Sequence, residues 1–195
     1  MIIKINYNLG LQQRHNLHIV VNHYQNQLEN YKRNEVDLLL NVGYANYRID
    51  EESFIGIEDV ALKRCAIFEI ANDIITHRMQ ECGIIYCSTK SDCNKLVDVL
   101  NYMGVHCGLY YSDVDLHRNY NYKTHALNDW MRGAVNIMVC TSAFGLGTNK
   151  ANVRFVKIYG VPNDIAEFYQ QFGRGGRDQL PTDCTLYYNY IDFVK

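Results

Sequence analysis

Hydrophobic and polar positions follow one pattern up to about residue 65 and another beyond it. From residue 66 onward, short apolar runs typical of buried strands alternate with segments whose apolar residues recur every three or four positions. This alternation predicts a parallel sheet with helices on both faces. Residues 1–65 are rich in Asn, Tyr and Gln, and their clearest strand-like run is residues 17–21. We therefore predict a doubly wound α/β domain over residues 66–195 and a poorly patterned appendage over residues 1–65. Within the appendage, residues 22–59 are interpreted as partly ordered or as an insertion.

Apolar runs and helical spacing also predict the elements of the domain. The expected strands are residues 84–87, 105–110, 135–140, 153–158 and 184–188. Four helices are expected. The first runs through Ile67, Ile70, Ala71, Ile74 and Ile75 and ends at Gly83, and the second is capped by Ser91 or Asp92 and ends at Gly104. The third covers residues 116–131, with Tyr120, Leu127 and Trp130 facing inward, and the fourth runs from a cap at Asn163 to Gly173. Ligands of such a sheet bind beyond the carboxyl ends of its strands, so we expect the chemistry in the loops after Cys87, Cys140 and Tyr159.

Composition narrows the class of protein. The net charge of −2 over 195 residues gives no sign of nucleic acid from the chain as a whole, so any such surface must be local. The seven cysteines form no C-x-x-C pair, which favours buried thiols in a reducing compartment over disulfides or a metal site. No apolar stretch approaches the ~20 residues that span a membrane, and residues 1–5 lack the apolar core of a signal peptide. We expect a nuclear or cytoplasmic protein that contacts no membrane and has no metal ligands of its own.

Arg174 and Arg177 lie in a glycine-rich turn, residues 173–177, with the sequence G-R-G-G-R. Guanidinium groups stay charged and fork onto phosphate oxygens, so two of them on one tight turn suit a triphosphate. In phosphoryl transfer, an arginine that stabilises the charge of the transition state is worth roughly 10³–10⁵ in rate. Taken alone, such a turn is more often an exposed basic loop.

Two other segments follow apolar strands. Residues 141–150 contain two glycines, which let backbone amides approach a phosphate, and the hydroxyls of Thr141 and Ser142, which can donate to it. Ser88, Thr89 and Lys90 stand where a strand opens into a helix and can bind a nucleic-acid phosphate. The structural alternatives are a loop whose glycines only make turns and a helix cap followed by a solvated lysine.

Together and in this order, these segments resemble the carboxyl-terminal RecA-like lobe of superfamily 2 helicases, specifically the RecQ group. Residues 83–87 are similar to the family's motif IV, residues 140–150 with 153–156 to motif V, and residues 170–178 to motif VI. The form Ala143-Phe144-Gly145 favours RecQ over the DEAD-box group. Residues 14–17 also resemble the element at the entrance to this lobe, and the main resemblance covers about residues 83–192.

The resemblance implies a role for each matching residue. Arg174 and Arg177 would reach the γ-phosphate of ATP, which a first RecA-like lobe would hold with Mg²⁺, and Gln170 would couple nucleotide state to lobe closure. Asn149 and Gly147 would lie beside the nucleotide, Asn149 near the ribose. The expected contacts to the phosphates of a single DNA strand are Ser88, Thr89, Lys90, Thr141 and Ser142. The family also implies 3′ to 5′ polarity, DNA repair and recombination, and a nuclear location.

Several positions depart from the family's pattern. The family usually has Glu at Gln171, a small residue at Phe172, Ala at Gly175, Gly at Gln179 and Pro at Ala151. Its Y-H-A-G-L element is replaced by residues 110–114, Y-Y-S-D-V. These departures indicate a divergent copy.

The sequence contains no G-x-x-x-x-G-K loop followed by Ser or Thr and no D-E-x-H pair, the parts of a first lobe that hold phosphate and Mg²⁺. We therefore expect neither ATP hydrolysis nor unwinding from this polypeptide alone. The leading hypothesis is the carboxyl-terminal lobe of an ATP-dependent RecQ-like DNA helicase. The alternative is a non-catalytic remnant of such a helicase that binds nucleic acid or protein, and a generic α/β domain with accidental motifs ranks last.

Overall fold

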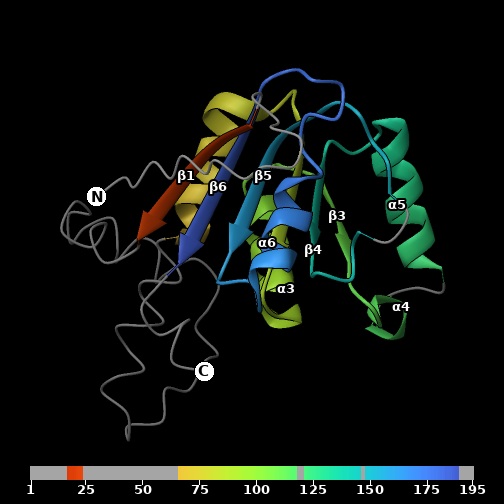
Figure 1. Cartoon of the computed structure of the whole chain (residues 1–195). Coiled ribbons are helices and arrows are strands. Elements are labelled where there is room, and N and C mark those ends of the chain that lie inside the picture. The colour runs from red at the N-terminus through yellow and green to blue at the C-terminus, as the bar shows by residue number, and fades with distance from the viewer. Residues whose placement is uncertain (1–16, 24–65, 118–120, 146–147, 189–195) are drawn as a thin grey trace, which may run out of the picture.

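A single parallel sheet organises the protein. The computed structural model describes residues 17–23, 66–117, 121–145 and 148–188. Six strands pair in the order β1-β6-β5-β2-β4-β3, and every neighbouring pair is parallel. They are β1 (Leu17–His23), β2 (Cys82–Cys87), β3 (Cys107–Tyr110), β4 (Ile137–Cys140), β5 (Val153–Tyr159) and β6 (Thr182–Tyr188). Helices lie on both faces of the sheet (Figure 1), which confirms the doubly wound α/β class.

The amino-terminal segment contributes one strand to this sheet. β1 pairs with β6 over seven positions, from Leu17 beside Thr182 to His23 beside Tyr188. The expected boundary at residue 65 falls outside the described residues, as does most of the segment 22–59, of which only Asn22 and His23 are described, as the end of β1. Tyr120, Gly147 and the first three residues of the element at residues 14–17 also fall outside them.

The central strands β2, β4 and β5 are buried on both faces, and successive residues of β2 enter two different cores. Ile85 and Cys87 pack with the helix over residues 66–73, its π-helical continuation η2 (Ile74–Arg78) and α3 (Lys90–Tyr102). Ile84 and Tyr86 pack with α5 (Tyr122–Arg132) and α6 (Ile165–Phe172). Burial of alternate residues on opposite faces explains why the strands read as continuous apolar runs.

The helix predicted through residues 67–75 is confirmed, but its predicted end at Gly83 is wrong. The helical segment ends at Arg78, and Gly83 lies inside β2. A Cβ atom on Gly83 would lie 2.0 Å from Cζ of Phe155, so the glycine is needed where the Phe155 ring crosses the neighbouring strand. Trp130 also donates its Nε1–H to the carbonyl of Gly83 at 3.3 Å.

The predicted amino-terminal caps of two helices are one or more residues out of place. Thr89, and neither Ser91 nor Asp92, caps α3, because its extended backbone lets Oγ1 accept the amide of Asp92 at 3.1 Å. Asp164, and not Asn163, caps α6 by accepting the amide of Glu167 at 2.7 Å. The predicted carboxyl-terminal ends are confirmed: Gly104, with φ 81°, follows the last turn of α3, and Gly173 ends α6.

The helix predicted over residues 116–131 is two helices. α4 (Val114–His117) is a single turn, and α5 begins after Asn121, whose φ of 64° breaks the helical path. Trp130 is buried and Leu127 packs partly against the same core, as predicted.

Buried thiols are confirmed for most of the cysteines. The six described cysteines are free, and five of them are buried. Burial raises the pKa of the Cys82 thiol to about 11. Within the described ranges, no helix is long and apolar enough to cross a membrane.

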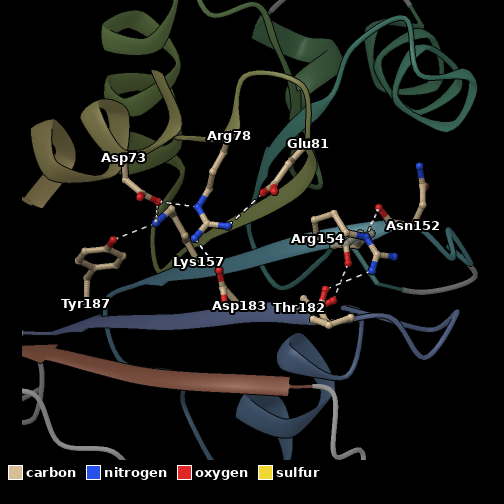
Figure 2. Close-up of polar contacts among 11 residues, drawn as sticks. Asp73, Arg78, Glu81, Asn152, Arg154, Lys157, Thr182, Asp183 and Tyr187 are labelled. Carbon is tan, nitrogen blue, oxygen red and sulfur yellow. Dashed lines mark hydrogen bonds and ion pairs between the residues drawn. The ribbon is translucent and has the colours of Figure 1, made fainter. Parts of the chain in front are cut away.

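A charged network ties the first helical segment to the sheet (Figure 2). Lys157, in the middle of β5, is 3% exposed, and its ammonium lies 2.7 Å from Oδ2 of Asp73 and donates to the hydroxyl of Tyr187 at 3.0 Å. Arg78 donates to the same Asp73 oxygen at 2.8 Å and to Asp183 on β6 at 2.6 Å. The network therefore crosses from the helix to both strands.

The two cations decide the charge of Asp73. Burial alone would raise the pKa of the Asp73 carboxyl, but the charges and hydrogen bonds of Lys157 and Arg78 outweigh burial and hold that pKa below its usual value. Burial lowers the pKa of Lys157, and Asp73 opposes this effect. Asp73 is thus the anion that lets a lysine occupy the core.

We expect Asp73→Asn to destabilise the protein and Lys157→Met to leave stability nearly unchanged. The first substitution leaves a buried ammonium without its anion, which costs about 2–3 kcal/mol given the partial exposure of Asp73, whereas the second removes the buried charge and leaves Asp73 paired with Arg78, a change within about 1 kcal/mol. Urea unfolding at pH 7 measures both. Equal losses in the two variants would contradict this account of the network.

The same carboxyl predicts a pH dependence. Because the folded state lowers the pKa of Asp73, its contribution to stability is complete above the unfolded pKa of about 3.9 and is lost as the pH falls through the folded pKa. The unfolding free energies of the wild type and Asp73→Asn should therefore differ at pH 7 and converge below about pH 4. Asp98→Asn, an exposed change on α3, is the control and should follow the wild type at every pH.

Candidate functional site

Arg174 and Arg177 meet at one backbone carbonyl. Nη1 of Arg174 donates to the carbonyl oxygen of Thr148 at 3.0 Å, and Nη1 of Arg177 donates to the same oxygen at 3.1 Å. Both side chains are half-buried. The structure thus brings the two sequence-predicted arginines together and places them against the loop after β4.

The arginine turn lies at the amino end of β5. Phe172, buried at the end of α6, anchors it, and the amide of Gly176 donates to the carbonyl of Val153, the first residue of β5, at 3.0 Å. The expectation that all the chemistry lies beyond the carboxyl ends of the strands is therefore wrong for these arginines. The reason is that α6 starts after the carboxyl end of β5 and runs back along the sheet (Figure 1).

The loop after β4 is held by Phe144. Its ring is buried and makes edge-to-face contacts with Tyr110 and Trp130, with centroids 5.0 and 5.4 Å apart. The buried hydroxyl of Tyr86 donates to the carbonyl of Phe144 at 3.0 Å. Burial raises the pKa of Tyr86, while the nearby charges of Arg174 and Arg177 act in the opposite direction.

Gly145 lets Arg174 pass over the backbone of this loop. A Cβ atom at Gly145 would lie 3.1 Å from Nη2 and 3.6 Å from Cζ of Arg174. A side chain at this position would press on the guanidinium, which would have to shift by a few tenths of an ångström.

The other residues predicted to contact nucleotide do not donate to the Thr148 carbonyl in the contacts described. Oδ1 of Asn149 accepts a hydrogen bond from Nη1 of Arg177 at 2.6 Å, so the Asn149 side chain helps to orient Arg177. Gln170 is exposed on α6, four residues before Arg174, and Gly147 is outside the described residues.

Arg154 is a site residue that sequence reasoning missed. From the start of β5, it forms an ion pair with Asp178 and donates to the carbonyls of Asn152 at 3.3 Å and Pro181 at 3.2 Å (Figure 2). It therefore joins the segment leading into β5 to the segment that follows the arginine turn. An arginine inside an apolar strand next to a glycine-rich loop was the available signal.

The residues predicted to contact DNA gather at the other end of the sheet, beside the carboxyl ends of β2, β3 and β5. The amide of Thr141 donates to the carbonyl of Tyr110 at 3.2 Å, and Ser142 next to it is exposed. The amide of Ser88 donates to the carbonyl of Tyr159, also at 3.2 Å. Thr89 caps α3, and Lys90 forms an ion pair with Asp113.

The site therefore has two halves at opposite ends of one sheet. Arg174, Arg177 and Asn149 form the first, and residues 88–90 with Thr141 and Ser142 form the second. Residues 141–150 run from the second half, at Thr141, to the first half, at Thr148 and Asn149.

Residues 66–179 match the family model described as "Helicase conserved C-terminal domain". The chain is 35% identical over 127 residues to "ATP-dependent DNA helicase Q-like 4B" of Arabidopsis thaliana. It is 35% identical over 112 residues to "ATP-dependent DNA helicase RecQ" of Haemophilus influenzae. It is also 39% identical over 127 residues to a protein of Acanthamoeba polyphaga mimivirus that is named as a putative ATP-dependent RNA helicase. The matches cover 65%, 57% and 64% of this chain, but 11%, 17% and 22% of those relatives.

We expect Gly175→Ala, which introduces the residue that the family resemblance implies at this position, to destabilise the arginine turn. A Cβ atom on Gly175 would lie 2.5 Å from Cγ2 of Thr182, and overpacking of this kind costs about 1–3 kcal/mol. Thr182→Ser removes that methyl group and keeps the hydroxyl that donates to Val153 at 2.8 Å. The double variant should therefore recover most of the stability in urea unfolding, and a double variant as unstable as Gly175→Ala would exclude this explanation.

Proposed function

Because the chain belongs to the RecQ-like helicases of superfamily 2, as their carboxyl-terminal RecA-like lobe, we propose that it supplies the arginines of an ATP site between two lobes and binds a single strand of DNA at the opposite end of its sheet. The observation that carries this proposal is the meeting of Arg174 and Arg177 at Thr148. A first RecA-like lobe would hold most of the ATP and its Mg²⁺.

The contacts of the arginines suit this role. In the three hydrogen bonds described above, the acceptors are neutral oxygens of Thr148 and Asn149, so these bonds orient the guanidinium groups without neutralising them. The two guanidinium groups carry like charges and share one carbonyl oxygen. A triphosphate would stabilise both of them, because it carries the opposite charge and accepts bidentate hydrogen bonds from each. Arginines placed in this way stabilise the charge that develops on the transferred phosphoryl group.

We propose that the loop over residues 141–150 couples the ATP site to the DNA contacts. Thr141 and Ser142 stand at the proposed DNA edge, and Thr148 and Asn149 bind the arginines. An arginine that moves from Thr148 to a γ-phosphate releases one end of the loop whose other end faces the strand. We propose that nucleotide state changes the DNA contacts in this way, with Gln170 contributing to lobe closure and with the 3′ to 5′ polarity of the family.

We expect the 195-residue polypeptide alone to show no Mg²⁺-dependent ATP hydrolysis, since phosphoryl transfer needs both lobes around the nucleotide. A chimera tests the arginines: the matching segment of the Arabidopsis thaliana relative is exchanged for residues 66–188 of this chain, and hydrolysis is measured with single-stranded DNA. Arg174→Ala and Arg177→Ala should each lower kcat by about 10³. The Lys variants should not restore it, because lysine lacks the fork.

Arg132→Ala is the matched control, because Arg132 is exposed on α5 and pairs only locally, with Asp129, in the contact described. It should leave kcat unchanged. A chimera that hydrolyses ATP equally well without either arginine would refute the proposed ATP site. A folded chimera that binds DNA but has no activity would favour the non-catalytic alternative.

A further inference from the structure

Both oxygens of one carboxylate hold the ammonium of Lys90. Lys90 is the first residue of α3, and its Nζ lies 2.7 Å from Oδ1 and 2.8 Å from Oδ2 of Asp113, in the segment between β3 and α4. The hydroxyl of Ser112 donates to Oδ1 of Asp113 at 3.3 Å. The ammonium also lies 6.0 Å from the centroid of the Tyr111 ring. Three consecutive residues of one loop thus surround Lys90.

Among residues 88–90, Lys90 has the side chain that can most easily leave its present partner, Asp113, for another anion. The hydroxyl of Thr89 caps α3, and loss of such a cap destabilises a helix. Oγ of Ser88 lies so close to Gly160 that a Cβ atom on Gly160 would be 2.1 Å from it. The Lys90 and Asp113 side chains are 51% and 32% exposed, and an ion pair between such solvated side chains contributes little to stability.

From this geometry we infer that Asp113 competes with nucleic-acid phosphate for Lys90 and so weakens the binding of a single DNA strand at the carboxyl edge of the sheet. The inference rests on the proposed function, in which residues 88–90 contact that strand. The two carboxylate oxygens contact the same ammonium group that phosphate oxygens would bind. A phosphate that reaches Lys90 must displace Asp113 or lie beside its like charge, and both arrangements reduce affinity.

The competitor is charged under the conditions in which the strand binds. The hydrogen bond from Lys90 is the largest influence on the carboxyl of Asp113, and with the loop contacts it holds the pKa below its usual value, so that Asp113 is ionised at neutral pH. Because both side chains are solvated, salt weakens this pair as it weakens phosphate contacts. Asp113 therefore lowers the affinity of the DNA edge, and it acts through Lys90.

Asp113→Asn tests this inference, because asparagine keeps the shape of the side chain and its acceptor oxygen while removing the charge. Fluorescence anisotropy with a labelled oligodeoxythymidylate, at several salt concentrations, measures the affinity of the full chain. We expect the variant to bind about 2–5-fold more tightly, the range set by a surface ion pair. The slope of the logarithm of the affinity against the logarithm of the salt concentration should become steeper, by up to the amount expected for about one additional phosphate contact.

Asp98→Asn is the matched control, since it makes the same change of charge at an exposed position of α3 eight residues after Lys90. It should alter affinity much less than Asp113→Asn. Lys90→Ala should weaken binding, and the double variant Lys90→Ala/Asp113→Asn should bind no more tightly than Lys90→Ala. Unfolding in urea checks that all four variants are folded.

Each failure has its own signature. If the wild type binds DNA and Asp113→Asn binds no more tightly than Asp98→Asn, or if the gain persists without Lys90, the inference is overturned and the proposed function stands. If no variant binds the oligonucleotide at low salt, the proposed DNA contact fails and the inference fails with it. Tighter binding of a matching oligouridylate by every variant would reassign the edge to RNA, and the effect of Asp113→Asn would then be judged on that ligand.

Discussion

Burial of the central strands β2, β4 and β5 on both faces is the constraint on which the rest of the structure depends. Because helices cover both faces of these strands, exposed functional groups are left to the ends of the strands and to the loops. The arginines lie at one end and residues 88–90 at the other, and a single loop, residues 141–150, spans the distance between them. A buried cation is tolerated only with its anion, as the pairing of Lys157 with Asp73 illustrates.

The cations at the two ends rest on partners of different kinds. In the hydrogen bonds described, Arg174 and Arg177 donate to neutral oxygens, which orient the two guanidinium groups beside Thr148. Lys90 instead forms an ion pair with the carboxylate of Asp113. If the proposed function holds, the first arrangement suits a small, highly charged ligand, and the second suits weak, reversible contact with a DNA strand.

Close contact at glycines links the sequence motifs to this geometry. Gly83 admits the ring of Phe155 and Gly145 admits the guanidinium of Arg174. Gly175 fits under the methyl group of Thr182, which explains why this chain has glycine where the family resemblance implies alanine. A glycine and the side chain that crosses it are thus constrained together, although they lie far apart in the sequence.

Local pattern alone determined much of this protein. The apolar runs predicted the strands, including the isolated run at residues 17–21, and Gly104 and Gly173 predicted where two helices end, because strand burial and helix termination depend on neighbouring residues. The order of the motifs was enough to identify the RecQ-like lobe. Only the tertiary structure decided that Gly83 lies within a strand, that Lys157 has a buried anion, that Arg154 clamps the arginine turn and that Asp113 holds Lys90. Each of these pairs side chains that the chain brings together only when the sheet forms, and the periodicity of a single segment carries no information about such partners.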